Sequence, residues 1–385
     1  MRSPLVLAAV LGLATVLGTC PVRAQSQWHV ETVDADHPYS GGVSVAVAPT
    51  GQPAVAYGHF IRNNESSLRF AVRTSAGAWP VQTLDSQDDT GHGPNLAFDT
   101  AGRPHVVYYS YWSGPVKYAT ETGSGWQIGQ VAADGVVPSM ALDTSNRPCV
   151  AYCTDAGHLM YAAWNGAAWS SQTVDTSSEF TSVSLALDQG TRPRISYYDS
   201  VYRDLKYAEW TGTLWNTTVV DDESAGQFNA LAVDSSGRPH IAYYDQSRWH
   251  LKYAVRDGST WSVDRITDAT GFFGPGALWT DIALDDADHP RIIYNDWYDT
   301  DSLMFASWDG AGWTFEAADP NVQGVSGTAL ALDDQGRPYV AYISQQPSNI
   351  LMVAWVPEPA SLALLAAGCL TLRRHGRRRT SSGAP

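Results

Sequence analysis

The sequence has little lysine and little charge. Only three lysines occur among its 385 residues, and Asp and Glu outnumber Lys and Arg by 39 to 24. The net charge of −15 argues against a nucleic-acid partner, because phosphates are bound by lysine and arginine. Charged residues make up 16% of the chain and hydrophobic residues 44%, which excludes a disordered acidic protein.

Cysteine is also scarce. Cys20 and Cys369 lie near the two ends, so Cys149 and Cys153 are the only cysteines of the body. Four residues along a strand span about 13 Å, whereas the Cα atoms of a disulfide lie within about 7 Å. We therefore expect two free, buried thiols rather than a disulfide.

Familiar catalytic and metal-binding motifs are missing. The chain has no His-Glu-x-x-His, Gly-x-Ser-x-Gly or Cys-x-x-Cys sequence, and its histidines are scattered. The chain instead contains seven copies of one sequence repeat. A tryptophan recurs at intervals of 43 to 52 residues, at positions 28, 79, 126, 169, 215, 261 and 313.

The repeat predicts a β-propeller. Each copy reads Leu-Ala-Leu-Asp, Gly-Arg-Pro, a Tyr-rich segment, Leu-Lys-Tyr-Ala and then the tryptophan, as in residues 230–261. Four strand-like segments in 40 to 50 residues are typical of a propeller blade. We expect an all-β fold over residues 28–355, a seven-bladed β-propeller of four-stranded antiparallel blades.

Loop lengths predict the strand order. The longest connection runs from the Trp strand to the next Leu-Ala-Leu-Asp, so the former should be outermost and the latter innermost. Residues 28–33 are then an orphan outer strand, and the last repeat, residues 328–355, has only three strands. We expect this N-terminal strand to complete the last blade and close the ring.

The turn after Leu-Ala-Leu-Asp needs one residue with positive φ. That slot holds a residue type tolerant of such a backbone in six copies, Gly51, Gly102, Asn146, Gly237, Asp288 and Gly336. The fourth copy has Thr191, and we expect it to turn differently. The recurrent aspartates at 99, 143, 188, 234, 285 and 333 should cap these turns, and the repeat arginines should pair with acids or stack between blades.

The N-terminus has the pattern of an export signal. Residues 1–24 combine Arg2, an apolar stretch and a small-x-small site at residues 22–24, which predicts a cleaved signal peptide.

The C-terminus, residues 356–385, carries Pro357, Glu358 and Pro359, a short apolar run and an arginine cluster. The cluster comprises Arg373, Arg374, Arg377, Arg378 and Arg379. This order resembles the PEP-CTERM sorting signal of Gram-negative bacteria. The resemblance implies an exosortase-type partner at the inner membrane, transient contact with that membrane, and delivery to the cell envelope, surface or extracellular matrix. Without both ends the body would hold 17 basic and 38 acidic residues, a net charge of −21.

The face with the longer loops is the expected binding face. Extra aromatic residues gather there beside carboxylates, a combination that suits the C–H faces and hydroxyl groups of sugars. The candidate ligand-binding residues are Trp112, Asp199, Tyr244, Asp245, Trp249, Phe272, Phe273, Trp279, Asp296, Trp297 and Tyr298. A second hypothesis is that Asp296, Asp299 and Asp301 hold Ca²⁺ through oxygen ligands.

Binding and catalysis both remain open at this point. The segment Ser307 to Trp313 loosely resembles the Asp-box of sialidase-type propellers but is one residue short. Glycosidases need two suitably spaced carboxylates, and this chain offers many pairs. We expect a non-catalytic surface or matrix propeller that binds or scaffolds a ligand such as exopolysaccharide. The alternatives are a glycan-cleaving hydrolase or lyase and a purely structural surface protein.

Overall fold

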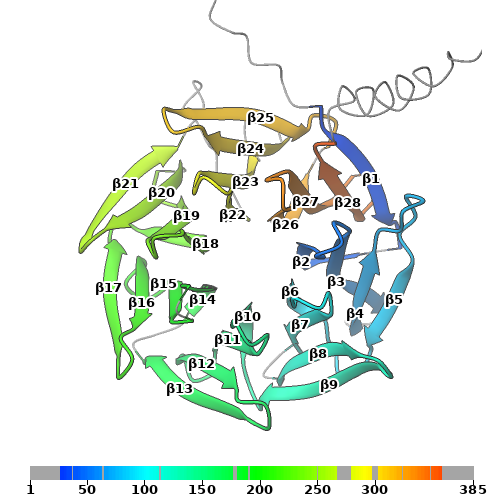
Figure 1. Cartoon of the computed structure of the whole chain (residues 1–385), viewed down its shortest axis with the longest axis horizontal. Helices are drawn as coiled ribbons and strands as arrows, with labels where there is room; N and C mark the ends of the chain where they lie inside the picture. Colours follow the sequence, from blue (N-terminus) through cyan, green and yellow to red (C-terminus); the bar gives the residue numbers. More distant parts are fainter. Residues whose placement is uncertain are drawn as a thin grey trace, which may run out of the picture.

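The computed structural model describes residues 27–357 except 37, 63–64, 112–113, 177–179, 190, 249, 267–278, 297–301, 323 and 347. Within this part of the chain there are 28 strands and no helix. The strands form seven four-stranded antiparallel sheets arranged around a central axis, as Figure 1 shows. The predicted seven-bladed propeller is therefore confirmed.

Each sheet is one blade, and its strands follow the sequence repeat. The strands of blades 1 to 3 are, in chain order, β2 (Pro38–Val47), β3 (Pro53–Arg62), β4 (Glu65–Val72), β5 (Val81–Asp85), β6 (His92–Phe98), β7 (Pro104–Tyr109), β8 (Val116–Thr122), β9 (Gly125–Ala132), β10 (Val136–Leu142), β11 (Pro148–Cys153), β12 (Leu159–Trp164) and β13 (Trp169–Asp175).

Blades 4 to 6 repeat this arrangement. Their strands are β14 (Phe180–Leu187), β15 (Pro193–Asp199), β16 (Asp204–Trp210), β17 (Trp215–Asp221), β18 (Ala225–Val233), β19 (Pro239–Asp245), β20 (His250–Asp257), β21 (Thr260–Ile266), β22 (Asp281–Leu284), β23 (Pro290–Asp296), β24 (Ser302–Trp308) and β25 (Trp313–Asp319). Blade 7 comprises β26 (Val325–Leu332), β27 (Pro338–Ser344), β28 (Ile350–Trp355) and β1 (His29–Asp34).

The N-terminal strand closes the ring. β1 pairs antiparallel with β28, from His29 opposite Trp355 to Asp34 opposite Leu351, and becomes the outer strand of blade 7 (Figure 1). Glu31 of β1 then reaches blade 1, where the Arg73 guanidinium donates to both carboxylate oxygens at 2.7 and 2.8 Å. The predicted closure is confirmed, and it removes the open sheet edges that would invite association with other chains.

The turns after the inner strands form as expected and need one correction. In blade 2, for example, Asp99 accepts hydrogen bonds from the backbone N–H groups of Ala101 and Arg103 and from the Arg103 side chain. The repeat arginines at 147, 238 and 337 pair with their turn aspartates in the same way.

The prediction that Thr191 turns differently was wrong. Thr191 has φ of 64°, and its N–H donates to the Asp188 carbonyl at 2.8 Å, as in the other copies. The capped hydrogen-bond pattern therefore outweighs the preference of a β-branched residue against positive φ.

The core lies between the blades. Seven hydrophobic clusters each join two neighbouring blades. The repeated outer tryptophan packs edge-on against an aromatic residue of the preceding blade, as Trp261 does on Tyr207 with ring centroids 5.2 Å apart. The repeated tryptophans therefore pack at the edges between blades.

A buried tyrosine links most blades to the outer strand of the blade before. Tyr243 of β19 donates to Asp221 at the end of β17 at 2.7 Å, and Tyr57, Tyr108, Tyr197 and Tyr342 make the equivalent bond. At the boundary of blades 2 and 3 the aspartate position is Ala132, so Tyr152 lacks this partner.

The two cysteines of the body are as the sequence predicts. Cys149 and Cys153 are both buried and free, as expected, and burial raises the pKa of each thiol. No helix in the described ranges is long and apolar enough to cross a membrane. The two terminal signals, residues 1–24 and residues 358–385 with Glu358, Pro359 and the arginine cluster, lie outside the described residues, so they stay predictions.

Candidate functional site: the mouth of the central channel

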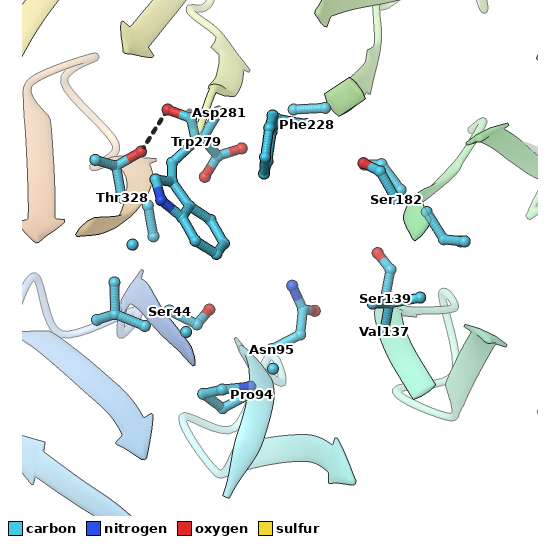
Figure 2. Close-up of a pocket in the computed structure, with 18 of the residues that line it drawn as sticks. Ser44, Pro94, Asn95, Val137, Ser139, Ser182, Phe228, Trp279, Asp281 and Thr328 are labelled. Atoms are coloured by element: carbon cyan, nitrogen blue, oxygen red, sulfur yellow. Dashed lines mark hydrogen bonds between the residues drawn. The ribbon is translucent and has the colours of Figure 1, made fainter. Parts of the chain in front are cut away.

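A pocket of about 440 Å³ lies where the seven inner strands begin. This is the face that carries the long links between blades. Every blade contributes three consecutive residues to the wall, and Tyr109 is added from β7 (Figure 2). The volume falls in the range of sites that hold small ligands.

The wall is built on β-bulges. Six of the seven inner strands slip in register against their neighbours at the pocket residues, for example between His92 and Asn95 and between Gln227 and Ala230. The exception is β22, which begins only at Asp281 and pairs without a slip. We call the first wall residue of each blade the bulge position. These residues are Gly42, Gly93, Val137, Ser182, Phe228, Trp279 and Gly327.

The bulge position makes the pocket one-sided. Blades 7, 1 and 2 have glycine there, whereas blades 5 and 6 have Phe228 and Trp279. Phe228 and Trp279 hold φ of 51° and 81°, a region that bulky residues rarely occupy. Such a conformation costs about 1–3 kcal/mol per residue and concentrates at binding sites. The two aromatic rings therefore form a platform opposite a wall of bare backbone.

Hydrogen bonds to the neighbouring blades hold these aromatic residues in place. The Thr328 hydroxyl donates to the backbone carbonyl of Trp279 at 2.9 Å, the bond drawn in Figure 2. The Thr280 hydroxyl donates in the same way to the carbonyl of Phe228. Each strained segment is thus held by a threonine of the following blade, and the platform is preformed.

Two residues further along each inner strand lies what we call the acceptor position. In five blades its side chain accepts a backbone N–H from the next inner strand at 2.7–3.1 Å. The donor and acceptor pairs are Leu96 to Ser44, Met140 to Asn95, Leu185 to Ser139, Leu231 to Ser184, and Leu330 to Asp281. Ala230 and Ala329 occupy this position in the other two blades. The ring of short polar side chains both joins the blades and faces the pocket.

These side chains retain hydrogen-bonding capacity for a ligand. A serine hydroxyl that accepts a backbone N–H still has its own proton to donate. Asn95 accepts through Oδ1, and Figure 2 shows its amide nitrogen pointing into the pocket. The pocket therefore combines hydroxyl and amide donors with an aromatic platform.

Asp281 is the one carboxylate among the described lining residues, which include no Lys, Arg or His. Its two oxygens accept the N–H groups of Ile282 at 2.8 Å and Leu330 at 2.7 Å. Burial nevertheless raises the pKa of Asp281 to about 6, and these two backbone bonds oppose that rise. A half-buried acid whose pKa is raised in a pocket wall is typical of a functional site.

Of the predicted ligand-binding residues with described side chains, only Trp279 lines this pocket. Asp199 and Asp245 are completely buried and hold the loops after β15 and β19. Each caps backbone N–H groups of its own loop and pairs with a lysine, Lys206 at 2.6 Å and Lys252 at 2.9 Å. Both carboxylates are therefore engaged with protein groups. Tyr244 is also buried, with 2% of its surface exposed.

The remaining predicted residues cannot be placed as ligand contacts. Trp112, Trp249, Phe272, Phe273, Trp297, Tyr298, Asp299 and Asp301 lie outside the described residues, and only the backbone of Asp296 is described. The Ca²⁺ hypothesis rests on three of these. Within the described ranges no group of three or more His, Cys, Asp or Glu side chains is arranged to hold a metal ion.

Two other pockets are built mainly from groups that already have partners. One of about 420 Å³ between blades 5 and 6 has Tyr253, Trp308 and Trp313 in its wall. Its Arg238 is bound to Asp234 at 2.6 Å. The other, beside Lys252, holds the ion pairs of that lysine with Asp221 and Glu223. In neither pocket does an aromatic residue of the described wall have positive φ.

The acceptor ring and Phe228 were not predicted from the sequence. A usable signal exists, because the residue directly before each Leu-Ala-Leu-Asp segment is Ser, Asn or Asp in five of seven copies. The bulge residues lie two places earlier. The bulge position is glycine in three copies and a large aromatic residue in two. Such variation in side-chain size indicates a position that faces a shared cavity.

No family model matches the chain, and no curated protein has a similar sequence. Solved structures do match. The chain shares its fold with propeller lectins. The BP39L lectin of Burkholderia pseudomallei aligns with 83% of this chain and 96% of its own, with a TM-score of 0.65 and 16% identity. The fucose-specific lectin of Aleuria aurantia aligns with 74% of this chain and 97% of its own, with a TM-score of 0.52 and 17% identity.

A third solved structure, AofleA of Arthrobotrys oligospora, has a TM-score of 0.51 and 11% identity, and covers 76% of this chain and 89% of its own. The Aleuria aurantia lectin is described as a six-bladed propeller, one blade fewer than here. Identities this low show the fold alone.

Proposed function

We propose that this protein is a non-catalytic carbohydrate-binding propeller, exported and held at the cell surface or in the extracellular matrix, where it binds or scaffolds a polysaccharide. The observation that carries this proposal is the one-sided pocket at the channel mouth. Trp279 and Phe228 offer flat apolar faces to sugar C–H groups, and Asn95, Asp281 and the serines offer hydrogen bonds to hydroxyl groups.

The pocket composition favours binding over cleavage. Glycoside hydrolysis requires two carboxylates about 5 to 10 Å apart, one of them acting as acid. The described wall of this pocket supplies only Asp281, and both of its oxygens already accept backbone hydrogen bonds. The fold shared with propeller lectins supports the same choice.

Export and surface location rest on the two terminal segments. An N-terminal signal would carry the chain across the inner membrane, and the PEP-CTERM-like tail would be recognised there by an exosortase-type enzyme. The acidic body would then stay soluble among other polyanions unless cations bridge them.

The binding experiment uses purified full-length protein on a glycan array, followed by calorimetry with the glycans that bind. Trp279→Ala should weaken binding about tenfold, because an aromatic platform contributes about 1 kcal/mol or more. Trp308→Ala, which alters the pocket between blades 5 and 6, is the matched control and should leave affinity unchanged. Equal loss in both variants, or loss only in Trp308→Ala, contradicts the proposed site. Turnover of any bound polysaccharide contradicts the non-catalytic role.

A further inference from the structure

The charge inside the pocket is unbalanced. Asp281 is the only ionisable carboxylate of the described wall, and both groups bonded to it are neutral backbone N–H groups. No basic side chain lies in that wall. This contrasts with Asp199, Asp221 and Asp245, each of which has a lysine nitrogen 2.6–2.9 Å from its carboxylate.

The strands packed around β22 do not supply a cation either. β18 and β26, which flank it on the channel side, contain no ionisable residue. On β19, His240 is held by Asp234 at 3.2 Å and Asp245 by Lys252. On β23, the Arg291 guanidinium is bound to Asp285 at 2.6 Å, and the side chain of Asp296 is not described. Tyr109 is the other ionisable group of the wall.

The two aromatic rings lie on the same side of the pocket as Asp281 (Figure 2). Trp279 and Phe228 lie with ring centroids 5.4 Å apart and planes tilted by 52°, and Figure 2 shows the Asp281 carboxylate beside both rings. A cation near such rings is attracted by their negative faces, and a nearby carboxylate adds a charge-assisted hydrogen bond. A neutral sugar would use the platform but would leave the half-buried Asp281 charge without a counterion.

We infer that the pocket selects a sugar residue that carries a protonated amino group, the ammonium binding Asp281 and the ring stacking on Trp279. This inference rests on the proposed carbohydrate-binding function and names its ligand class. The ligand is thus a glycan containing amino sugars that lack their N-acetyl groups. The acidic body, with a net charge of −21 between the two terminal signals, would attract such a cationic chain from solution.

The environment of Asp281 supports a coupling between binding and pH. An ammonium ion binds the ionised carboxylate, and burial keeps the pKa of Asp281 near 6 in the absence of ligand. A ligand with a permanent positive charge should therefore bind more tightly as the pH rises from 5 to 7 and release a proton from Asp281 on binding.

The experiment compares three β-1,4-linked oligosaccharides of equal length on the full-length protein: a glucosamine oligomer, its N-acetylated form and its N,N,N-trimethylated form. The glucosamine oligomer should bind about tenfold more tightly than the N-acetylated one at pH 6.5, the effect of one charge-assisted contact. In Asp281→Asn, which keeps an oxygen to accept the Leu330 N–H, this ratio should fall to about one.

The trimethylated oligomer tests the inference on the wild-type protein alone, whatever the stability of the variant. Its affinity should rise about tenfold between pH 5 and pH 7, and 0.5 M salt should weaken it. Equal or preferred binding of the N-acetylated oligomer overturns the inference but leaves carbohydrate binding intact. A pH-independent affinity for the trimethylated oligomer also overturns it. Failure of every glycan on the array to bind overturns the proposed function, and the inference with it.

Discussion

Replacing Asp281 by asparagine should change how the stability of this propeller depends on pH. In the folded protein the pKa of Asp281 is about 6, whereas a carboxyl group of this type ordinarily has a pKa of 3.8. A difference of roughly two pH units corresponds to about 3 kcal/mol between the protonated and ionised forms. The ionised carboxylate therefore lowers the free energy of unfolding, and asparagine has no charge to do so.

The sign of this change in stability with pH follows from proton binding. Between pH 4 and pH 6 the folded protein holds the Asp281 proton, whereas the unfolded chain has already released it. The stabilisation from this raised pKa is fully present below pH 3.8 and is lost as the pH rises through about 6. The free energy of unfolding of Asp281→Asn, measured relative to that of the wild type, should therefore be about 2.4 kcal/mol higher at pH 8 than at pH 4.

Urea unfolding of both proteins at pH 4, 5, 6, 7 and 8 measures this directly, because titration of all other groups is shared and cancels in the difference. The Asp281 carboxylate accounts for two expected effects. It lowers the stability of the protein at neutral pH, and it gives a cationic ligand its tenfold higher affinity. A stability difference that stays constant within about 0.5 kcal/mol across this range would refute the reasoning.

Three further substitutions test the scaffold by chemical denaturation. Thr191→Gly should raise the free energy of unfolding by about 0.5–1 kcal/mol, because glycine accepts the φ of 64° without a Cβ clash; a decrease would contradict the assigned turn. Glu31→Gln should cost about 1–2 kcal/mol at pH 7, since it breaks the ion pair that closes the ring. Hydrogen bonding to Arg73 lowers the pKa of Glu31 to about 2. The cost of Glu31→Gln should therefore shrink as the pH falls from 4.5 towards 2, and a cost that does not depend on pH would contradict the role of this ion pair. Tyr243→Phe should cost about 2 kcal/mol by leaving Asp221 short of a donor, and the control Tyr152→Phe should cost less; equal costs would rule out a role for the inter-blade bond.

The repeat made the scaffold predictable. Strand number, strand order and ring closure follow from seven copies of one motif and from the lengths of the links between them, because a propeller has few ways to satisfy both. The failure at Thr191 shows the limit of a rule about single residues. Its turn is held by the Asp188 cap and by backbone bonds common to all copies, and these outweigh the local preference.

The site was less predictable because it depends on backbone detail. Trp279 was chosen as an extra aromatic residue on the long-loop face, and the structure places it in the pocket wall. Its partner Phe228 was missed. Aligning the seven copies places Phe228 in the bulge slot, but its positive φ cannot be read from the sequence. Asp199 and Asp245 were chosen for their charge and position. The structure instead buries them against lysines that lie seven residues further along the chain.

The most direct test of the account is a crystal structure of the full-length protein with the glucosamine oligomer bound. The predicted result is one sugar ring stacked on Trp279 at the channel mouth, with its ammonium nitrogen within about 3 Å of an Asp281 oxygen. A sugar bound instead in the pocket of Trp308 and Trp313 between blades 5 and 6, with the channel mouth empty, would contradict it.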